Sequence, residues 1–119
     1  MNSHICYNMN ICSYSIGVLF MYQPMNEDLV EKVAQTFKAL SDPTRVKILH
    51  LLYNKECSVS EIANELQMNQ STISHQLKYL RQLHLVKKRR DKTNYFYSPD
   101  DYHVMNLLEQ TVEHTKHTE

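Results

Sequence analysis

The stretch that decides the fold of this 119-residue chain is SVSEIANELQMNQSTISHQLKYLRQLHLVKKRRDKTNYFYS, residues 58–98. Ser58 and Glu61 form a capping-box pattern, which predicts a short helix over residues 59–66. A three-residue turn separates this helix from a longer one over residues 70–83, which carries apolar residues at helical spacing. A short helix, a three-residue turn and a longer helix together have the spacing of a helix-turn-helix.

Two short strands follow the longer helix, residues 86–90 and residues 95–98, and they join across residues 91–94. This β-hairpin interleaves tyrosines with five basic side chains, which are Lys87, Lys88, Arg89, Arg90 and Lys92. Such a cluster is often only a solvated ribbon. Beside a helix-turn-helix it indicates a wing that lies along the phosphate backbone of DNA.

The longer helix presents a polar face on the side away from Ile73 and Leu77. The candidate DNA-contacting residues on this face are Gln70, Ser71, Ser74, His75 and Lys78. An amide, small hydroxyls and an imidazole near a helix N-terminus can reach base edges in a major groove. For the imidazole of His75 the alternative is a solvated surface position. The pattern predicts double-stranded DNA as a partner.

Two further helices are expected before the helix-turn-helix, and both carry apolar side chains at helical spacing. They span residues 27–40 and residues 43–53, the second capped by Asp42 with Pro43 at its first position. The expected fold class is therefore mainly α with a small β-hairpin, a winged helix-turn-helix.

Charge is unevenly spread along the chain, although the formal net charge is zero. Residues 70–97 carry seven Lys and Arg against one acid, whereas residues 98–119 carry one against five. One basic block in a neutral chain indicates a local anionic partner rather than a generally basic protein. No stretch approaches the length of a transmembrane helix, so we expect no membrane partner.

The C-terminal stretch SPDDYHVMNLLEQTVEHTKHTE, residues 98–119, predicts a long helix over residues 98–117. Ser98 is the expected N-cap, and Pro99 would occupy the first helical position. Three histidines fall on one stripe of this helix: His103, His114 and His117. The alternative for these histidines is a solvated face at a polar helix end.

The spacing of these histidines predicts a metal site shared between two chains. His114 and His117 are i, i+3 neighbours, whereas His103 lies eleven residues before His114, roughly 16 Å along the axis. Metal–nitrogen bonds are only about 2 Å long, so one straight helix cannot bring all three rings to one ion. A second, antiparallel copy can, which predicts a homodimer through the terminal helices with two equivalent metal sites.

Asp101 is the candidate fourth ligand, because it lies two residues before His103. Three imidazoles and one carboxylate suit Zn(II) and also Co(II), whereas an octahedral Ni(II) site would need further ligands such as His4. Positions i and i+2 diverge on a regular helix, so the two side chains converge only if the helix begins at or after Asp101. The alternative role of Asp101 is a capping box with Ser98.

Residues 1–24 contain no charged residue, and we expect a disordered extension or a spurious translation start, with residues 25–119 as the domain. His4, Cys6 and Cys12 offer the alternative of a soft metal site or a thiol redox pair. Cys57 is expected to be a small apolar filler. Three cysteines without a secretion signal indicate the reducing cytoplasm.

The sequence gives little support to an enzyme. From residue 25 onward there is no glycine, which excludes Gly-rich phosphate loops and leaves the turns to Asn and Asp. No HExxH or GxSxG pattern is present. A zinc hydrolase, the remote alternative, would need an open metal position and a base in a cleft, which four ligands at a dimer edge do not offer.

Residues 27–117 resemble the ArsR–SmtB family of winged-helix, metal-sensing bacterial repressors, and most closely its zinc- and cobalt-sensing CzrA type. The resemblance rests on LSDPTRVKILHLL (40–52), on MNQSTISHQLKYLRQLHLVKKRR (68–90) and on D-x-H-x10-H-x2-H from Asp101 to His117. It implies a dimer that represses metal efflux or resistance genes and leaves its pseudo-palindromic operator when Zn(II) or Co(II) binds.

The resemblance also implies roles for single residues. The four C-terminal residues would be inter-subunit ligands, and His114 would relay the change through a hydrogen bond to the backbone near His84. The family's other site, a Cys-x-Cys pair, is absent because Ser58 and Ser60 stand in its place, with Cys57 shifted by one position. The alternative reading is a DNA-binding regulator that responds to thiol oxidation through the cysteines of the first 24 residues.

Overall fold

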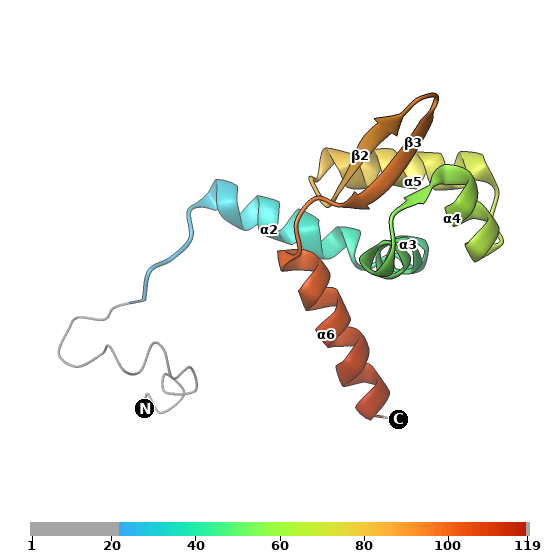
Figure 1. Ribbon diagram of the computed structural model, residues 1–119. Coiled ribbons are helices and arrows are strands. Elements are labelled where there is room, and N and C mark those ends of the chain that lie inside the picture. The colour runs from blue at the N-terminus through green and yellow to red at the C-terminus, as the bar shows by residue number, and fades with distance from the viewer. Residues whose placement is uncertain (1–21, 119) are drawn as a thin grey trace. The chain divides into compact units, whose positions relative to one another are not determined.

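The computed structural model of the protein describes residues 22–118, and the chain divides into two units, residues 1–30 and residues 31–119. The predictions for His4, Cys6 and Cys12 lie outside the described residues. The elements in chain order are α2 (Glu27–Ala39), α3 (Pro43–Asn54), β1 (Cys57–Ser58), α4 (Val59–Leu66), α5 (Gln70–Gln82), β2 (Val86–Asp91), β3 (Asn94–Pro99) and α6 (His103–His117) (Figure 1). None of these helices is long and apolar enough to cross a bilayer.

Side chains cap the starts of α4, α5 and α3, and the caps of α4 and α3 are those predicted from the sequence. At α4, the Glu61 N–H donates to Ser58 Oγ at 3.2 Å, and the Ser58 N–H donates to Glu61 Oε1 at 2.9 Å. At α5, Asn69 Oδ1 accepts a hydrogen bond from the Thr72 N–H at 2.8 Å. Asp42 caps α3 in the same way. The first backbone donors of each helix, which have no partner inside the helix, are thereby satisfied.

The strands form a three-stranded antiparallel sheet in the order β1-β3-β2. β2 and β3 make the predicted hairpin, called the wing below, with Arg90 opposite Tyr95. β1 was not predicted, because two residues carry no detectable alternation. It pairs with the middle strand, placing Cys57 opposite Tyr97, and so joins the wing to the chain that enters α4.

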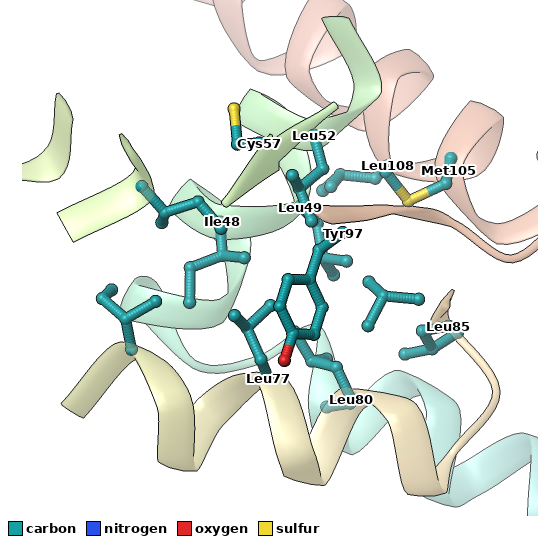
Figure 2. Close-up of a cluster of buried hydrophobic side chains, with 14 of the residues drawn as sticks. Ile48, Leu49, Leu52, Cys57, Leu77, Leu80, Leu85, Tyr97, Met105 and Leu108 are labelled. Atoms are coloured by element: carbon teal, nitrogen blue, oxygen red, sulfur yellow. The ribbon is translucent and has the colours of Figure 1, made fainter. Parts of the chain in front are cut away.

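The hydrophobic core lies between α3, α4, α5, the base of the wing and the first half of α6. Figure 2 shows Tyr97 extending from β3 towards Leu77 and Leu80 of α5, while Leu108 of α6 lies beside Leu52 of α3. Burying an apolar side chain of this size contributes about 1.5–3 kcal/mol. The side chains of α3, α4 and α5 that have no exposed surface therefore fix these helices against one another; they are Ile48, Leu49, Ile62, Ile73, Leu77 and Leu80.

The predicted start of the C-terminal helix is wrong. Ser98 and Pro99 belong to β3, where they pair with Lys87 and Val86, and the helix begins at His103. Sheet pairing satisfies the backbone here, and a proline is tolerated at the end of a strand. Ser98 therefore caps no helix, and its capping box with Asp101 does not form.

The tight turns are also made by other residues than predicted. The residues with positive φ between residues 22 and 118 are Gln67, His84 and Lys92, with φ of 58°, 60° and 61°, and none is Asn or Asp. At Gln67 the left-handed backbone lets the Met68 N–H donate to the Ala63 carbonyl at 3.0 Å, which closes the end of α4. Backbone hydrogen bonds of this kind offset the steric cost that a non-glycine residue has in this conformation.

Candidate DNA interface and metal half-sites

The exposed face of α5 carries the residues predicted to contact DNA. All five predicted side chains, Gln70, Ser71, Ser74, His75 and Lys78, are exposed, while the opposite face of the helix is buried in the core. α5 therefore presents an amide, two hydroxyls, an imidazole and an ammonium on one accessible surface. This set can donate to and accept from base edges and phosphates.

Arg45 contacts α5 through a hydrogen bond and an aromatic ring. No sequence pattern identified it as a residue that supports the DNA-contacting helix. Its Nε donates to the Ala39 carbonyl at 2.9 Å and its Nη1 donates to Gln76 Oε1 at 3.2 Å. Its guanidinium carbon lies 4.6 Å from the centre of the Tyr79 ring. Arg45 thus joins the end of α2 to the middle of α5, across a sequence separation that no local spacing can reveal.

The basic side chains of the wing are exposed, but they are not equivalent. The ammonium of Lys88 lies 4.4 Å from the centre of the Tyr95 ring, and the guanidinium carbon of Arg90 lies 6.0 Å from the same ring. Arg90 Nε donates to the Lys92 carbonyl at 2.8 Å and so stabilises the turn at the tip. These cations lie over an aromatic ring on the surface, which orders them without neutralising them.

Arg89 differs because a carboxylate occupies its guanidinium. Its Nε donates to Glu56 Oε2 at 3.0 Å and its Nη2 donates to Glu56 Oε1 at 2.8 Å, while its Cζ lies 5.2 Å from the Phe96 ring. The hydrogen bond from Arg89 lowers the pKa of the Glu56 carboxyl below its ordinary value, and Glu56 raises the pKa of Arg89. Both groups are therefore charged at neutral pH.

The candidate metal ligands form two pairs at opposite ends of α6. Asp101 Oδ1 lies 3.5 Å from His103 Nδ1, and the same oxygen accepts the His103 N–H at 2.9 Å. Because α6 begins at His103, the condition under which these two side chains converge is met. At the other end, His114 and His117 are exposed and one turn apart.

Within residues 22–118 of one chain, no three His, Cys, Asp or Glu side chains come together in a way that could hold a metal ion. The structure therefore brings together the members of each pair but not the two pairs. The first pair offers a carboxylate oxygen and an imidazole nitrogen, and the second offers two imidazole nitrogens; all four side chains are exposed and have the chemistry that Zn(II) and Co(II) accept.

The relay predicted between His114 and His84 has no counterpart inside one chain. The His84 N–H donates to the Arg81 carbonyl at 3.0 Å, and no hydrogen bond joins His84 to His114 among the residues that the structure describes. Cys57 is buried, with its Sγ donating to the Lys55 carbonyl at 3.6 Å, and burial raises the pKa of its thiol. It is placed as an apolar filler, not as a reactive thiol.

An apolar groove runs along α6 beside the end of α2 and the start of α3. It has a volume of about 640 Å³, and its lining includes Phe37, Leu40, Val46, Leu107 and Val112. The Phe37 side chain is 55% exposed and Leu107 is 40% exposed. Large apolar side chains gathered in one exposed groove are typical of a surface that another molecule covers.

Comparison with known proteins decides the family. Residues 42–88 match the bacterial regulatory proteins of the arsR family. The transcriptional repressor SmtB homolog of Synechocystis is 37% identical over 80% of this chain and 72% of its own length. This chain belongs to the arsR family. The regulator NmtR of Mycobacterium tuberculosis is 38% identical over 79% of this arsR-family chain and 78% of its own.

Solved structures of arsR-type regulators share the fold. The solution structure of apo-NmtR has a TM-score of 0.68 at 37% identity and covers 85% of each chain. A Mycobacterium bovis protein, described as a homodimeric winged helix-turn-helix DNA-binding domain, has a TM-score of 0.72 at 32% identity, over 83% of this chain and 94% of that one. The predicted winged helix-turn-helix is thereby confirmed. These relatives are transcriptional regulators, among them a cadmium resistance transcriptional regulatory protein of Staphylococcus aureus, and not enzymes, which agrees with the expectation that this arsR-family chain is not an enzyme.

Proposed function

We propose that this chain is a zinc- or cobalt-responsive repressor of metal efflux or resistance genes. It binds a pseudo-palindromic operator as a homodimer and leaves the operator when the metal binds between the two α6 helices. The observation that carries the proposal is the placement of two donor pairs at opposite ends of one exposed helix. Each pair alone has too few donors for a closed site, and two antiparallel copies of α6 would complete two sites at once.

The homodimer is supported by the apolar groove. The groove lies along α6, so a second copy that covers Phe37 and Leu107 also lies beside the candidate ligands. The M. bovis relative is described as homodimeric, which supports the same assembly here. In an interface with two-fold symmetry the same surface is used on both chains, and an antiparallel helix pair satisfies this requirement.

In the proposed site, Asp101 and His103 of one protomer face His114 and His117 of the other. Asp101 already accepts the His103 N–H through one carboxylate oxygen, which fixes the side chain and leaves its second oxygen for the ion. When bound, Zn(II) or Co(II) would supply a cross-link between two helix ends. The fit rests on the donor set, because three imidazoles and one carboxylate suit both ions.

The DNA-binding half of the proposal places α5 in a major groove and the wing along the backbone. The side chains that read bases are Gln70, Ser71, Ser74 and His75, while Lys78, Lys87, Lys88, Arg90 and Lys92 contact phosphates. Two α5 helices of a dimer must lie about 34 Å apart to meet successive major grooves. A change in how the α6 helices pack alters that spacing, so DNA and metal weaken one another's binding by the same factor.

A test of the shared site uses two defective variants. Asp101→Ala/His103→Ala removes the first pair from every chain, and His114→Ala/His117→Ala removes the second pair. Each variant alone should lose high-affinity Co(II) and Zn(II) binding, measured by calorimetry and by Co(II) absorption. Mixed and exchanged, they form heterodimers in which one site has lost all four ligands and the other has kept all four. Recovery of about one site per heterodimer supports the proposal.

The same mixture has outcomes that contradict the proposal. A site within one chain would gain nothing from mixing, and a protein that is monomeric in solution would leave both variants and the mixture unable to bind. The absorption spectrum of the Co(II) form also distinguishes two coordination numbers. Intense visible bands indicate four-coordination and support the zinc- and cobalt-type site, whereas weak bands indicate six-coordination of the nickel type.

The thiol-oxidation alternative is tested by deleting residues 1–24. The metal proposal predicts that release from DNA by Zn(II) survives the deletion, and the alternative predicts that the response is lost. Cys57 does not favour the alternative, because it is buried and its raised pKa keeps it protonated. The relay proposal has its own variant: if His114→Gln binds zinc and leaves DNA as the wild type does, His114 relays nothing to His84.

A further inference from the structure

Arg89 is the one wing cation, among the residues that the structure describes, whose guanidinium is engaged by a carboxylate through two hydrogen bonds. Phe96 covers one face of the guanidinium, with its ring centre 5.2 Å from Cζ. Two of the five N–H donors are used by Glu56, and the carboxylate offsets the charge of the guanidinium, so Arg89 is less available to a phosphate than the other cations of the wing. Among residues 22–118, no lysine of the wing has a hydrogen-bonded carboxylate partner, although Lys87 is close enough to help lower the pKa of Glu56.

Glu56 occupies a position that gives the pair a mechanical role. It precedes β1, the strand that leads directly into α4, the first helix of the helix-turn-helix. β1 and β2 lie on opposite sides of β3, so the contact between Glu56 and Arg89 spans the whole width of the sheet. The pair therefore connects the outer strand of the wing to the backbone that carries the helix-turn-helix.

Considered alone, the negative charge of Glu56 opposes the binding of phosphate. A carboxylate beside the wing lowers the positive potential that a DNA backbone would meet. Exposed ion pairs contribute little to folding stability, and both partners here are partly exposed, with 56% and 35% of their side-chain surface accessible. A role in holding the wing at a defined angle explains a carboxylate in this place.

We propose that Arg89 is a positioning residue and not a phosphate contact: with Glu56 it fixes the wing relative to α4, so that the lysines of the wing reach the DNA backbone. The proposal rests on the DNA binding proposed above. It revises the expectation, drawn from the basic run alone, that Arg89 contacts DNA. It also assigns a role in DNA binding to an acidic residue outside the wing.

The direction in which Glu56→Gln changes the affinity for DNA tests the proposal. Glu56→Gln removes a negative charge beside the wing, so electrostatics alone would tighten DNA binding. Positioning requires the opposite result, a weakening of about fivefold, because the hydrogen-bonded carboxylate is lost. The probe is a labelled duplex selected from a randomised library with the wild-type protein, and binding is measured by fluorescence anisotropy. Arg89→Gln should weaken binding similarly, and the double variant should be no weaker than Arg89→Gln.

Two measurements separate positioning from general effects. Glu65→Gln removes a carboxylate from the exposed surface of α4 without breaking an ion pair that the structure describes, and binding should stay equal or tighten slightly. The dependence of affinity on salt should have a smaller slope for Glu56→Gln than for the wild type, because the wing lysines lose phosphate contacts, whereas an Arg89 released to contact a phosphate would keep or increase the slope.

Three results have distinct meanings. Tighter or unchanged binding by Glu56→Gln overturns the proposal, and so does a salt slope for Glu56→Gln that equals or exceeds the wild-type slope. Weaker binding by both single variants, with a reduced salt slope for Glu56→Gln, supports it. If the wild-type protein selects no duplex and binds no unselected duplex at low salt, the proposed DNA-binding function itself fails, and the inference fails with it.

Discussion

α5 and α6 are helices of similar length, with 13 and 15 residues, and they are held in different ways. α5 buries Ile73, Leu77 and Leu80 completely, so its place against the core is set within one chain. α6 buries Met105 and Leu108 in its first half, and its second half, with both C-terminal histidines, is largely exposed. The part that would read DNA is therefore complete in one chain, whereas the part that would sense metal requires a second chain.

The same substitution in the two helices should have very different effects. Leu77→Ala removes a fully buried side chain, and we expect the free energy of unfolding to fall by about 3 kcal/mol. Leu107→Ala removes a 40% exposed side chain, and the chain's own stability should change by less than about 0.5 kcal/mol. Denaturant unfolding at low protein concentration, where the monomer prevails, measures both changes.

Association should show the reverse order. We expect Leu107→Ala to raise the dissociation constant of the homodimer about tenfold, measured by sedimentation equilibrium, because Leu107 lines the groove that a second chain would cover. Leu77→Ala should leave that constant nearly unchanged while the domain remains folded. Equal losses of stability at the two positions would show that α6 is held within one chain after all.

The caps of the two helices offer a finer contrast. Asn69→Ala removes the side chain that accepts the Thr72 N–H at the start of α5, and we expect a loss of about 1 kcal/mol in the free energy of unfolding. Asp101→Ala removes the hydrogen bond to the His103 N–H, at an exposed helix end where water can replace it. Its loss should be roughly half as large, and only Asp101→Ala should weaken Co(II) binding in calorimetry. A metal affinity unchanged by Asp101→Ala would leave this residue with its hydrogen bond to the His103 N–H as its one described role.

Alkaline pH should affect the core around α5 through Tyr97. Burial raises the pKa of the Tyr97 phenol above its ordinary value of 10.0, because the folded state disfavours the phenolate. The stability that this preference contributes is present below pH 10.0 and is lost as pH rises through the higher folded-state value. We expect the melting temperature of the wild type to fall above pH 10.0, and Tyr97→Phe to fall less steeply.

A control for this smallest effect is Tyr102→Phe, at a half-exposed position just before α6. It removes a hydroxyl from the C-terminal region instead of from the core, and we expect its melting curve to follow that of the wild type across the alkaline range. Identical curves for Tyr97→Phe and wild type would mean that the Tyr97 phenol does not contribute to alkaline unfolding.

Local chemistry explains what the sequence could predict. Three of the predicted features depend on residues that lie close together in the sequence, so a sequence pattern reveals them. They are the capping box of Ser58 and Glu61, the Asp42 cap with Pro43, and the apolar spacing of α5. The winged helix-turn-helix follows from such local signals, and the structure confirms it. The approach of Asp101 to His103 depends on where α6 begins, and that start was predicted wrongly, so the sequence left this pairing open.

Longer-range contacts explain what the sequence could not predict. Ser98 and Pro99 look like a helix start, but strand pairing with β2 competes for the same backbone and prevails. Glu56 and Arg89 are 33 residues apart, and Arg45 reaches Gln76 over 31, so no spacing rule connects them. Whether four ligands meet around one ion depends on a second chain and stays a prediction.

The largely exposed second half of α6 has a consequence for the living cell. On the proposed arrangement, diluting the protein separates the ligands of each ion as effectively as mutating them. A cell with few copies of this chain would contain monomers that neither hold the metal firmly nor span an operator. The number of copies in the cell would therefore set the metal concentration at which this regulator responds. If the protein repressed its own gene, each change in its synthesis would shift that concentration.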